Sequence, residues 1–234
     1  MCLISYLRSM QTSMYTNQTF RLNLHGHSFI LHAYKAMYWE TEQCLILADL
    51  HLGKGQHFRK NGIGVPADVS LDNFNRLDQL INTFQPKEVL ILGDLFHSTH
   101  NVMWDVLGGF CKKHSSVHFR LVPGNHDILE QSHYQNANIE LLDPIIERQG
   151  FFLSHHPLEA LPAGQYNLHG HIHPGVRLHG KGRQSMRLPA FHFGTSVGIL
   201  PAFGAFTGLA IVYPQEGDHV YGVIKNQKIL QIEC

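Results

Sequence analysis

The residues best suited to chemistry in this chain are aspartates, asparagines and histidines that directly follow apolar segments. They are Asp49, His51, Asp94, Asn125, His155, His171 and His173. Two pairs, Asp49 with His51 and His171 with His173, have a spacing that sends both side chains to one side of an extended backbone. Carboxylate, imidazole and amide ligands without sulfur suit Mn²⁺, Fe or Zn²⁺. These residues therefore predict a metal centre.

Seven ligands exceed the needs of one metal ion. If Asp94 bridges, each of two ions receives four protein groups. Two metals about 4 Å apart acidify a shared water, whose hydroxide attacks phosphorus in line, and they hold the oxygens of the displacement. The departing alkoxide needs a proton, which His126 can supply near neutral pH if a carboxylate such as Asp127 holds the ring. The alternative is that His126 only supports the ligands.

Strand-like segments must position these groups. Apolar runs or short segments of this kind cover Cys44–Leu47, Glu88–His97, Val117–Val122, Phe151–Leu153 and Asn167–Pro174. Open α/β sheets place their sites at the carboxyl ends of such strands. A single Gly–Asp after a strand is more often a turn with a helix cap, so the recurrence of the pattern carries the inference.

The segments between these strands predict crossover helices. Apolar residues recur every three or four positions over Leu71–Phe84, and Val106–Cys111 and Ile128–Tyr134 are candidates for two more helices. From Met186 onward, short strands and turns predict an antiparallel half. We expect a mixed α/β (α+β) fold with two sheets packed face to face and helices outside.

Composition sets limits on the class of protein. The 234 residues predict one domain, 1–234, with residues 1–18 as a loose N-terminal extension. Lys plus Arg equal Asp plus Glu at 18 each, which argues against a strong general attraction to nucleic acid or anionic membranes. The 19 histidines fit a site built from imidazole.

The four cysteines and the longest uncharged stretch indicate where the protein works. No C-x-x-C pair is present and Cys44 begins a buried strand, so a reducing cytoplasm is expected. No signal peptide is visible. Pro201, Gly204 and Gly208 interrupt the uncharged stretch Ser196–Pro214, which predicts core strands and a loop and no membrane association.

The order of these motifs resembles that of a known superfamily. Asp49-Leu-His51, Gly93-Asp94, Gly124-Asn-His-Asp127, His155 and Gly170-His-Ile-His173 are similar to the motif set of the calcineurin-like metallophosphoesterases. Within it, Ala48–Lys54, Gly62–Pro66 and Leu200–Gly208 resemble the bacterial ligase-associated DNA damage response endonuclease family, over about residues 20 to 215.

The resemblance implies a four-layer αββα sandwich, a dinuclear Mn²⁺-type site and hydrolysis of DNA phosphodiesters. It also implies DNA ligase and helicase repair proteins as partners. Carried over residue by residue, it places one metal on Asp49, His51, Asp94 and His173. The other metal falls on Asp94, Asn125, His155 and His171. His126 matches the family's non-ligand histidine, and His155 rather than His156 matches the ligand.

Substrate contacts are less sharply indicated. Basic residues of the Gly-rich loop 52–66 are candidates for phosphate contact, namely Lys54, Arg59 and Lys60. His97 resembles a phosphate-facing histidine of nuclease members, and a helix-capping surface histidine is its alternative. His169 and the region Arg177–Arg187 are candidates for a basic rim.

Two rival functions remain open at this point. A phosphatase or phosphodiesterase acting on a small nucleotide or lipid-linked diphosphate would use the same metal site. A non-catalytic scaffold with the same fold would predict missing ligands, and all seven are present.

Overall fold

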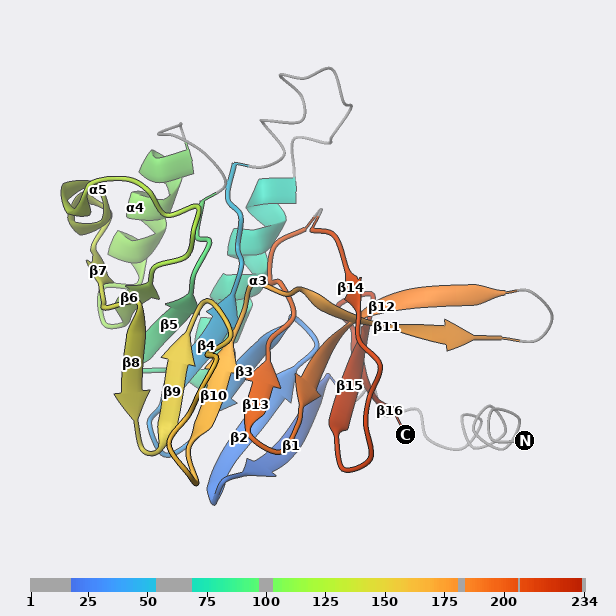
Figure 1. Ribbon diagram of the computed structural model, residues 1–234. Helices are drawn as coiled ribbons and strands as arrows, with labels where there is room; N and C mark the ends of the chain where they lie inside the picture. The colour runs from blue at the N-terminus through green and yellow to red at the C-terminus, as the bar shows by residue number, and fades with distance from the viewer. Residues whose placement is uncertain (1–17, 54–68, 97–102, 181–183, 206, 233–234) are drawn as a thin grey trace.

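The computed structural model describes residues 18–53, 69–96, 103–180, 184–205 and 207–232. These residues form two β-sheets packed face to face, with helices against the first sheet (Figure 1). The first sheet has seven strands in chain order: β1 (Thr19–Leu24), β2 (His27–His32), β3 (Ala36–Trp39), β4 (Cys44–Ala48), β5 (Glu88–Leu92), β6 (His118–Val122) and β7 (Ile139–Leu141). Strands β1 to β4 pair antiparallel and β4 to β7 pair parallel.

Three helices make the parallel crossovers of this sheet. They are α3 (Val69–Phe84), α4 (Met103–Lys113) and α5 (Gln131–Asn136). Apolar residues of α3 and α4 pack against Leu45, Leu47 and Ile91 in one cluster. The first two predicted helices are confirmed. The third begins at Gln131 instead of Ile128, whose side chain is 72% exposed and therefore does not extend the apolar face of a helix.

The second sheet has nine strands. They are β8 (Ile145–Arg148), β9 (Phe151–Ser154), β10 (Tyr166–His169), β11 (Pro174–His179), β12 (Ser185–Phe193), β13 (Val197–Ile199), β14 (Ala210–Ile211), β15 (His219–Ile224) and β16 (Lys228–Ile232). Their order is β14-β11-β12-β13-β10-β9-β8, with β15 pairing to β12 and β16.

The prediction of an antiparallel half after Met186 is only partly right. Strands β12, β13, β15 and β16 do pair antiparallel with one another, but β13 is parallel to β10 and β14 is parallel to β11. The intervening hairpin β11–β12 returns the chain so that β13 inserts beside β10. A parallel crossover made of strands leaves no helical period in the sequence, so the pattern could not reveal it.

Double burial explains the unbroken apolar runs. In β4, Cys44, Ile46 and Ala48 face the core between the sheets, whereas Leu45 and Leu47 face the helices. The mixed α/β class with two packed sheets is confirmed. All three described helices lie on the first sheet, and in the described ranges no helix covers the second one.

No helix in the described part of the chain is long and apolar enough to cross a membrane. The stretch Ser196–Pro214 contains two strands, β13 and β14, as the Pro and Gly spacing predicts. The expectation that both are core strands is wrong for β14, which is an edge strand of one exposed and one half-buried residue. Cys44 and Cys111 are buried free thiols, and burial raises the pKa of each.

Candidate metal centre

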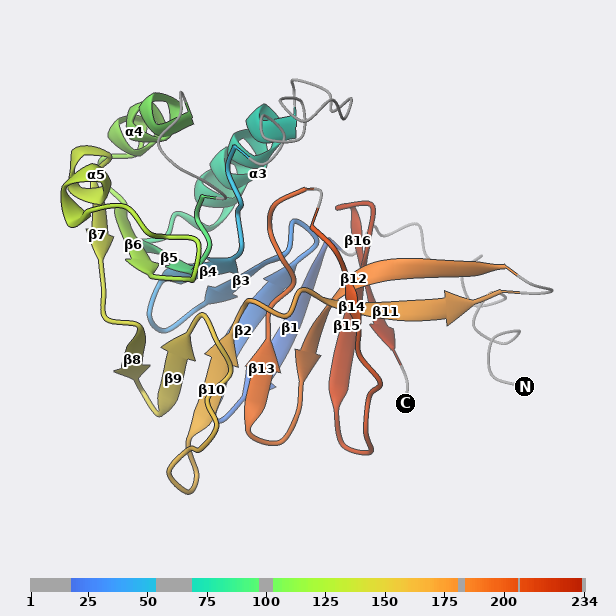
Figure 2. The same cartoon turned by 45° about the horizontal axis from the view of Figure 1, so that its top comes forward.

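The predicted ligands lie in the segments that follow five strands, at one edge of the packed sheets (Figure 2). Asp49 and His51 follow β4, and Asp94 follows β5. Asn125 comes after β6, His155 after β9, and His171 and His173 after β10. The carboxyl ends of these parallel strands meet at the same edge, so residues distant in sequence come together.

The backbone at these positions is left-handed. Positive φ angles occur at Asp49 (55°), His51 (47°), Asp94 (50°), His171 (66°) and His173 (52°). Such angles are uncommon outside glycine and cost about 1–3 kcal/mol each, and they gather at functional sites. We expected from the sequence that the pairs at i and i+2 lie on extended backbone, and the φ angles show that they do not. Turns in the loops bring the two side chains of each pair together instead.

One group of side chains surrounds the buried carboxylate of Asp49. The Nε2 atom of His173 is 3.6 Å from Asp49 Oδ1 and 3.3 Å from His51 Nε2. The second oxygen, Asp49 Oδ2, accepts a hydrogen bond from the His171 backbone N–H at 2.9 Å. Asp49 Oδ1 is buried and has no hydrogen-bond partner among the described residues. A cation beside this oxygen and the two imidazoles would compensate the burial of the charge.

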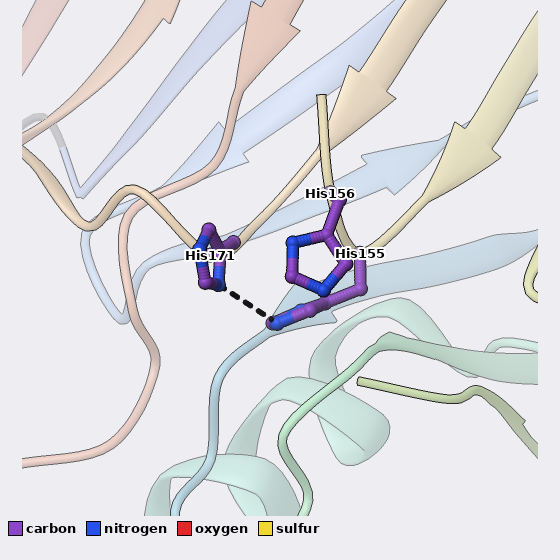
Figure 3. A group of neighbouring side chains, drawn as sticks. All are labelled: His155, His156 and His171. Carbon is purple, nitrogen blue, oxygen red and sulfur yellow. Dashed lines mark hydrogen bonds between the residues drawn. The ribbon is translucent and has the colours of Figure 1, made fainter. Parts of the chain in front are cut away.

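A second group surrounds His155. Its Nδ1 donates to the Leu92 carbonyl oxygen at 3.1 Å, which leaves the Nε2 lone pair free for another partner. That Nε2 lies 3.2 Å from Asn125 Oδ1 and 3.1 Å from His171 Nδ1. Figure 3 shows the His155 and His171 rings pointing toward each other from the loops after β9 and β10.

Asp94 contacts both groups with different oxygens. Its Oδ1 is 3.6 Å from His155 Nε2, and its Oδ2 is 3.8 Å from His51 Nε2. A carboxylate in this position can bridge two cations. The donor set contains oxygen and nitrogen atoms without sulfur, and it fits Mn²⁺, Fe or Zn²⁺.

Gly93 leaves room for the His155 ring to pack directly against the backbone after β5. Its φ angle is +76°, and a Cβ atom at this position would lie 2.2 Å from His155 Nδ1. Glycine therefore serves both the turn after β5 and the close approach of the His155 ring.

The comparisons with known proteins agree with this geometry. The family model of the calcineurin-like phosphoesterases matches residues 43–201. The chain belongs to this family. It is therefore a metal-dependent phosphoester hydrolase, and the resemblance found in the sequence is confirmed.

Two solved structures give the likeness in numbers. The Pseudomonas putida nuclease MPE is 27% identical, with a TM-score of 0.77 over 92% of this chain and 100% of that chain. The phosphoesterase Yfce from E. coli is 16% identical, with a TM-score of 0.42 over 81% of this chain and 97% of that chain. Among curated proteins, none matches the sequence.

His126 lies at the rim of this phosphoesterase site. Its ring centroid is 5.8 Å from that of His51, and its backbone N–H donates to Asp94 Oδ1 at 3.0 Å. The ring is half-buried, so it can reach a substrate from beside the ligand cluster. This placement suits a proton donor.

Asp127 accepts hydrogen bonds from backbone N–H groups of two loops. Its Oδ1 accepts backbone N–H groups of Leu95 (3.0 Å) and Phe96 (3.4 Å), and its Oδ2 accepts that of Gly124 (2.9 Å). Burial raises the pKa of this carboxyl to about 7. Asp127 thus ties the loop after β5 to the loop after β6, because its short side chain turns back onto the backbone.

The positions of two further histidines, His156 and His169, differ from what the sequence predicted. His156 is exposed, yet its ring nitrogen joins those of His155 and His171 in one cluster within 4.8 Å. Sequence reasoning chose only the buried His155, and the adjacent pair was the signal for both. His169 is not on a basic rim: it is buried, bonds the Gly170 carbonyl oxygen through Nδ1 at 2.8 Å, and has its pKa lowered to about 4 by burial.

A second His-Gly-His sequence occurs at residues 25–27. In the structure His25 packs against Tyr166 and His27 against Trp39. The predicted phosphate contacts lie outside the described residues; they are Lys54, Arg59, Lys60 and His97.

Proposed function

We propose that this chain hydrolyses phosphodiester bonds of DNA with two divalent metal ions, most simply Mn²⁺. The observation that carries the proposal is the position of Asp94. Its two oxygens face two separate groups of ligand atoms, one with His51 and the other with His155. A single-metal enzyme has no need for a carboxylate so placed.

Seven side chains would hold the two ions. Asp49, His51 and His173 complete one set and Asn125, His155 and His171 the other, with Asp94 shared. Bound metals would acidify a water and neutralise charge on the phosphoryl oxygens. His156 is a further nitrogen donor beside His171, with ring centroids 4.3 Å apart.

The protein's own residues would do the proton transfer and the positioning. His126 would protonate the departing alkoxide, because its ring is half-buried at the rim beside His51. Asp127 would keep the His126 loop in place through its three backbone hydrogen bonds.

DNA is favoured over a small phosphodiester because of the likeness to the Pseudomonas putida nuclease. That likeness extends over 92% of this chain and the whole of the nuclease. A DNA ligase or helicase as partner rests on the motif resemblance alone. The alternative substrate, a small nucleotide or lipid-linked diphosphate, remains consistent with the metal ligands.

The test compares substrates under one set of conditions. Mn²⁺-loaded protein should hydrolyse single-stranded, duplex or nicked DNA, and a chromogenic phosphodiester more slowly at equal phosphodiester concentration. Asp49→Ala, purified in parallel, should lose both activities and thereby exclude a contaminating nuclease. Hydrolysis of the chromogenic substrate without any DNA cleavage would favour the small-molecule alternative.

A further inference from the structure

The hairpin of β11 and β12 projects from the body of the protein. Figures 1 and 2 both show it extending sideways, away from the rest of the second sheet. Its described residues are 174–180 and 184–189, which we call the arm. The arm begins directly after His173, one of the candidate ligands. It is therefore joined to the metal centre by one continuous piece of backbone.

Acidic residues are absent from the part of the chain that contains the arm, whereas basic residues are present there. Residues 160–215 contain no Asp or Glu, although the whole sequence has 18 acidic and 18 basic residues. The basic residues of this stretch are Arg177, Lys181, Arg183 and Arg187. Of these, Arg177 and Arg187 belong to the described residues of the arm. A chain with no net charge thus carries a local positive charge on its arm.

Arg177 and Arg187 oppose each other across the two strands. They are register partners in the antiparallel pair, and both are exposed. Like charges directly opposite each other destabilise a hairpin. Within the described ranges, neither guanidinium has a carboxylate partner. An external anion between them would remove the repulsion, and a phosphate fits the geometry of two guanidinium groups.

An exposed aromatic ring shares a groove with Arg177. Tyr213 is 79% exposed and lines the same groove as Arg177 and His179, a groove of about 310 Å³. It follows β14, which pairs in parallel with β11. Alternating cations and exposed aromatic rings bind nucleic-acid strands, because bases stack on the rings while phosphates meet the cations.

We infer that the arm binds the nucleic-acid strand away from the scissile phosphate, with Arg177 and Arg187 on phosphate and Tyr213 stacked on a base. The inference rests on the proposed function. Four residues of extended strand place Arg177 about 13 Å beyond His173. A polymer held at the metals can reach that far, whereas a small phosphodiester cannot. The arm would therefore act on substrate selection and leave the chemical step unchanged.

The test removes the two arginines and measures binding. Labelled oligothymidylate is titrated into Mn²⁺-loaded protein carrying His126→Ala, so that the strand is not cut during the measurement. Arg177→Ala with Arg187→Ala should lower the salt slope of binding by about 1.4, that is about 0.7 for each phosphate contact to a single strand. Lys87→Ala with Lys112→Ala is the matched control, because both lysines are exposed at the opposite end of the strands. The control should keep the salt slope of the His126→Ala parent.

Tyr213 gives an independent readout. Tyr213→Ala should weaken binding of the single strand about tenfold, and Tyr213→Phe should keep it, since stacking needs only the ring. In the wild-type background, the double arginine variant should hydrolyse a chromogenic phosphodiester at the normal rate, which also shows that it folds.

The inference is overturned if the arginine variant and the lysine control bind the oligonucleotide equally, whether both keep the parent's affinity or both lose it. Failure of the proposed function looks different. The wild-type protein would then cleave no DNA, whether or not it hydrolyses the chromogenic phosphodiester, while the binding difference between the arm variant and its control could still be measured.

Discussion

The Nε2 atom of His155 lies 3.1 Å from the Nδ1 atom of His171. His155 already donates from Nδ1 to the Leu92 carbonyl oxygen, which favours the orientation in which Nε2 faces His171. Burial, and then the neighbouring His155, lower the pKa of His171, which disfavours a proton as the bridge between the two rings. Two nitrogen atoms held face to face in this way are arranged to share a metal cation.

The first prediction concerns metal content. Elemental analysis of protein purified without chelator should approach two transition-metal ions per chain, because Asp94 faces both groups of ligands. Asp94→Asn should lower this content, since the shared carboxylate serves both ions. A content of one ion that Asp94→Asn leaves unchanged would contradict the dinuclear centre.

The second prediction separates metal binding from proton transfer. His126→Ala should keep both metals, because no ligand is removed, and should lose about 10² to 10⁴ in rate on DNA. An ester with an acidic leaving group needs less protonation, so its hydrolysis should fall much less. Equal losses on both substrates would show that His126 is not the general acid.

The third prediction follows from the backbone contacts of Asp127. Asp127→Ala removes the acceptor for the N–H groups of Leu95, Phe96 and Gly124. The free energy of unfolding should fall by about 2 kcal/mol, the cost of leaving partly buried donors unpaired. Denaturant unfolding in chelator measures it, with the exposed Asp143→Ala as control. If Asp127→Ala is as stable as the control, the carboxylate does not tie the two loops together.

Much of the fold and the candidate site could be predicted from the sequence, for a specific reason. Strands buried on both faces, such as β4 and β5, are unbroken apolar runs, and each ligand stands where such a run stops. The amphipathic period of α3 is equally direct. These features are local, so a single sequence displays them.

Other features depend on contacts between distant segments. The left-handed backbone at Asp49 and Asp94 is imposed by pairing of the loops, through Asp49 N–H to Gly93 O and His51 N–H to Asp94 O. The partners of Asp127 and the burial of His169 likewise come from tertiary packing. No residue spacing encodes them, which is why the sequence placed His169 on a rim.

The fourth prediction concerns Gly204, which packs against the loop that carries Asp49. A Cβ atom on Gly204 would lie 2.3 Å from the Leu50 carbonyl oxygen, a backbone atom that cannot move aside cheaply. Gly204→Ala should therefore lower both the melting temperature and the metal content. Gly208→Ala is the matched control, because its Cβ would meet nothing within 4 Å. Identical behaviour of the two variants would show that the loop tolerates the displacement.

The last prediction concerns Lys35, whose Nζ donates to the Gly204 carbonyl oxygen at 3.0 Å from a buried position. Burial, and then the nearby Arg76, lower the pKa of Lys35 from 10.5 to about 7. Between pH 7 and 10.5 the unfolded chain thus binds a proton that the folded chain does not, so the stability of the folded state rises with pH.

Lys35→Met should remove this contribution. The free energy of unfolding of the wild type, measured by urea at several pH values in chelator, should gain up to about 1.4 kcal/mol per pH unit relative to Lys35→Met. Below pH 7 both folded and unfolded Lys35 are protonated, so the difference between the two proteins should become constant. Parallel curves from pH 7 to 10 would show that Lys35 is charged in the folded protein throughout, and that the surrounding carbonyl groups solvate its ammonium as well as water does.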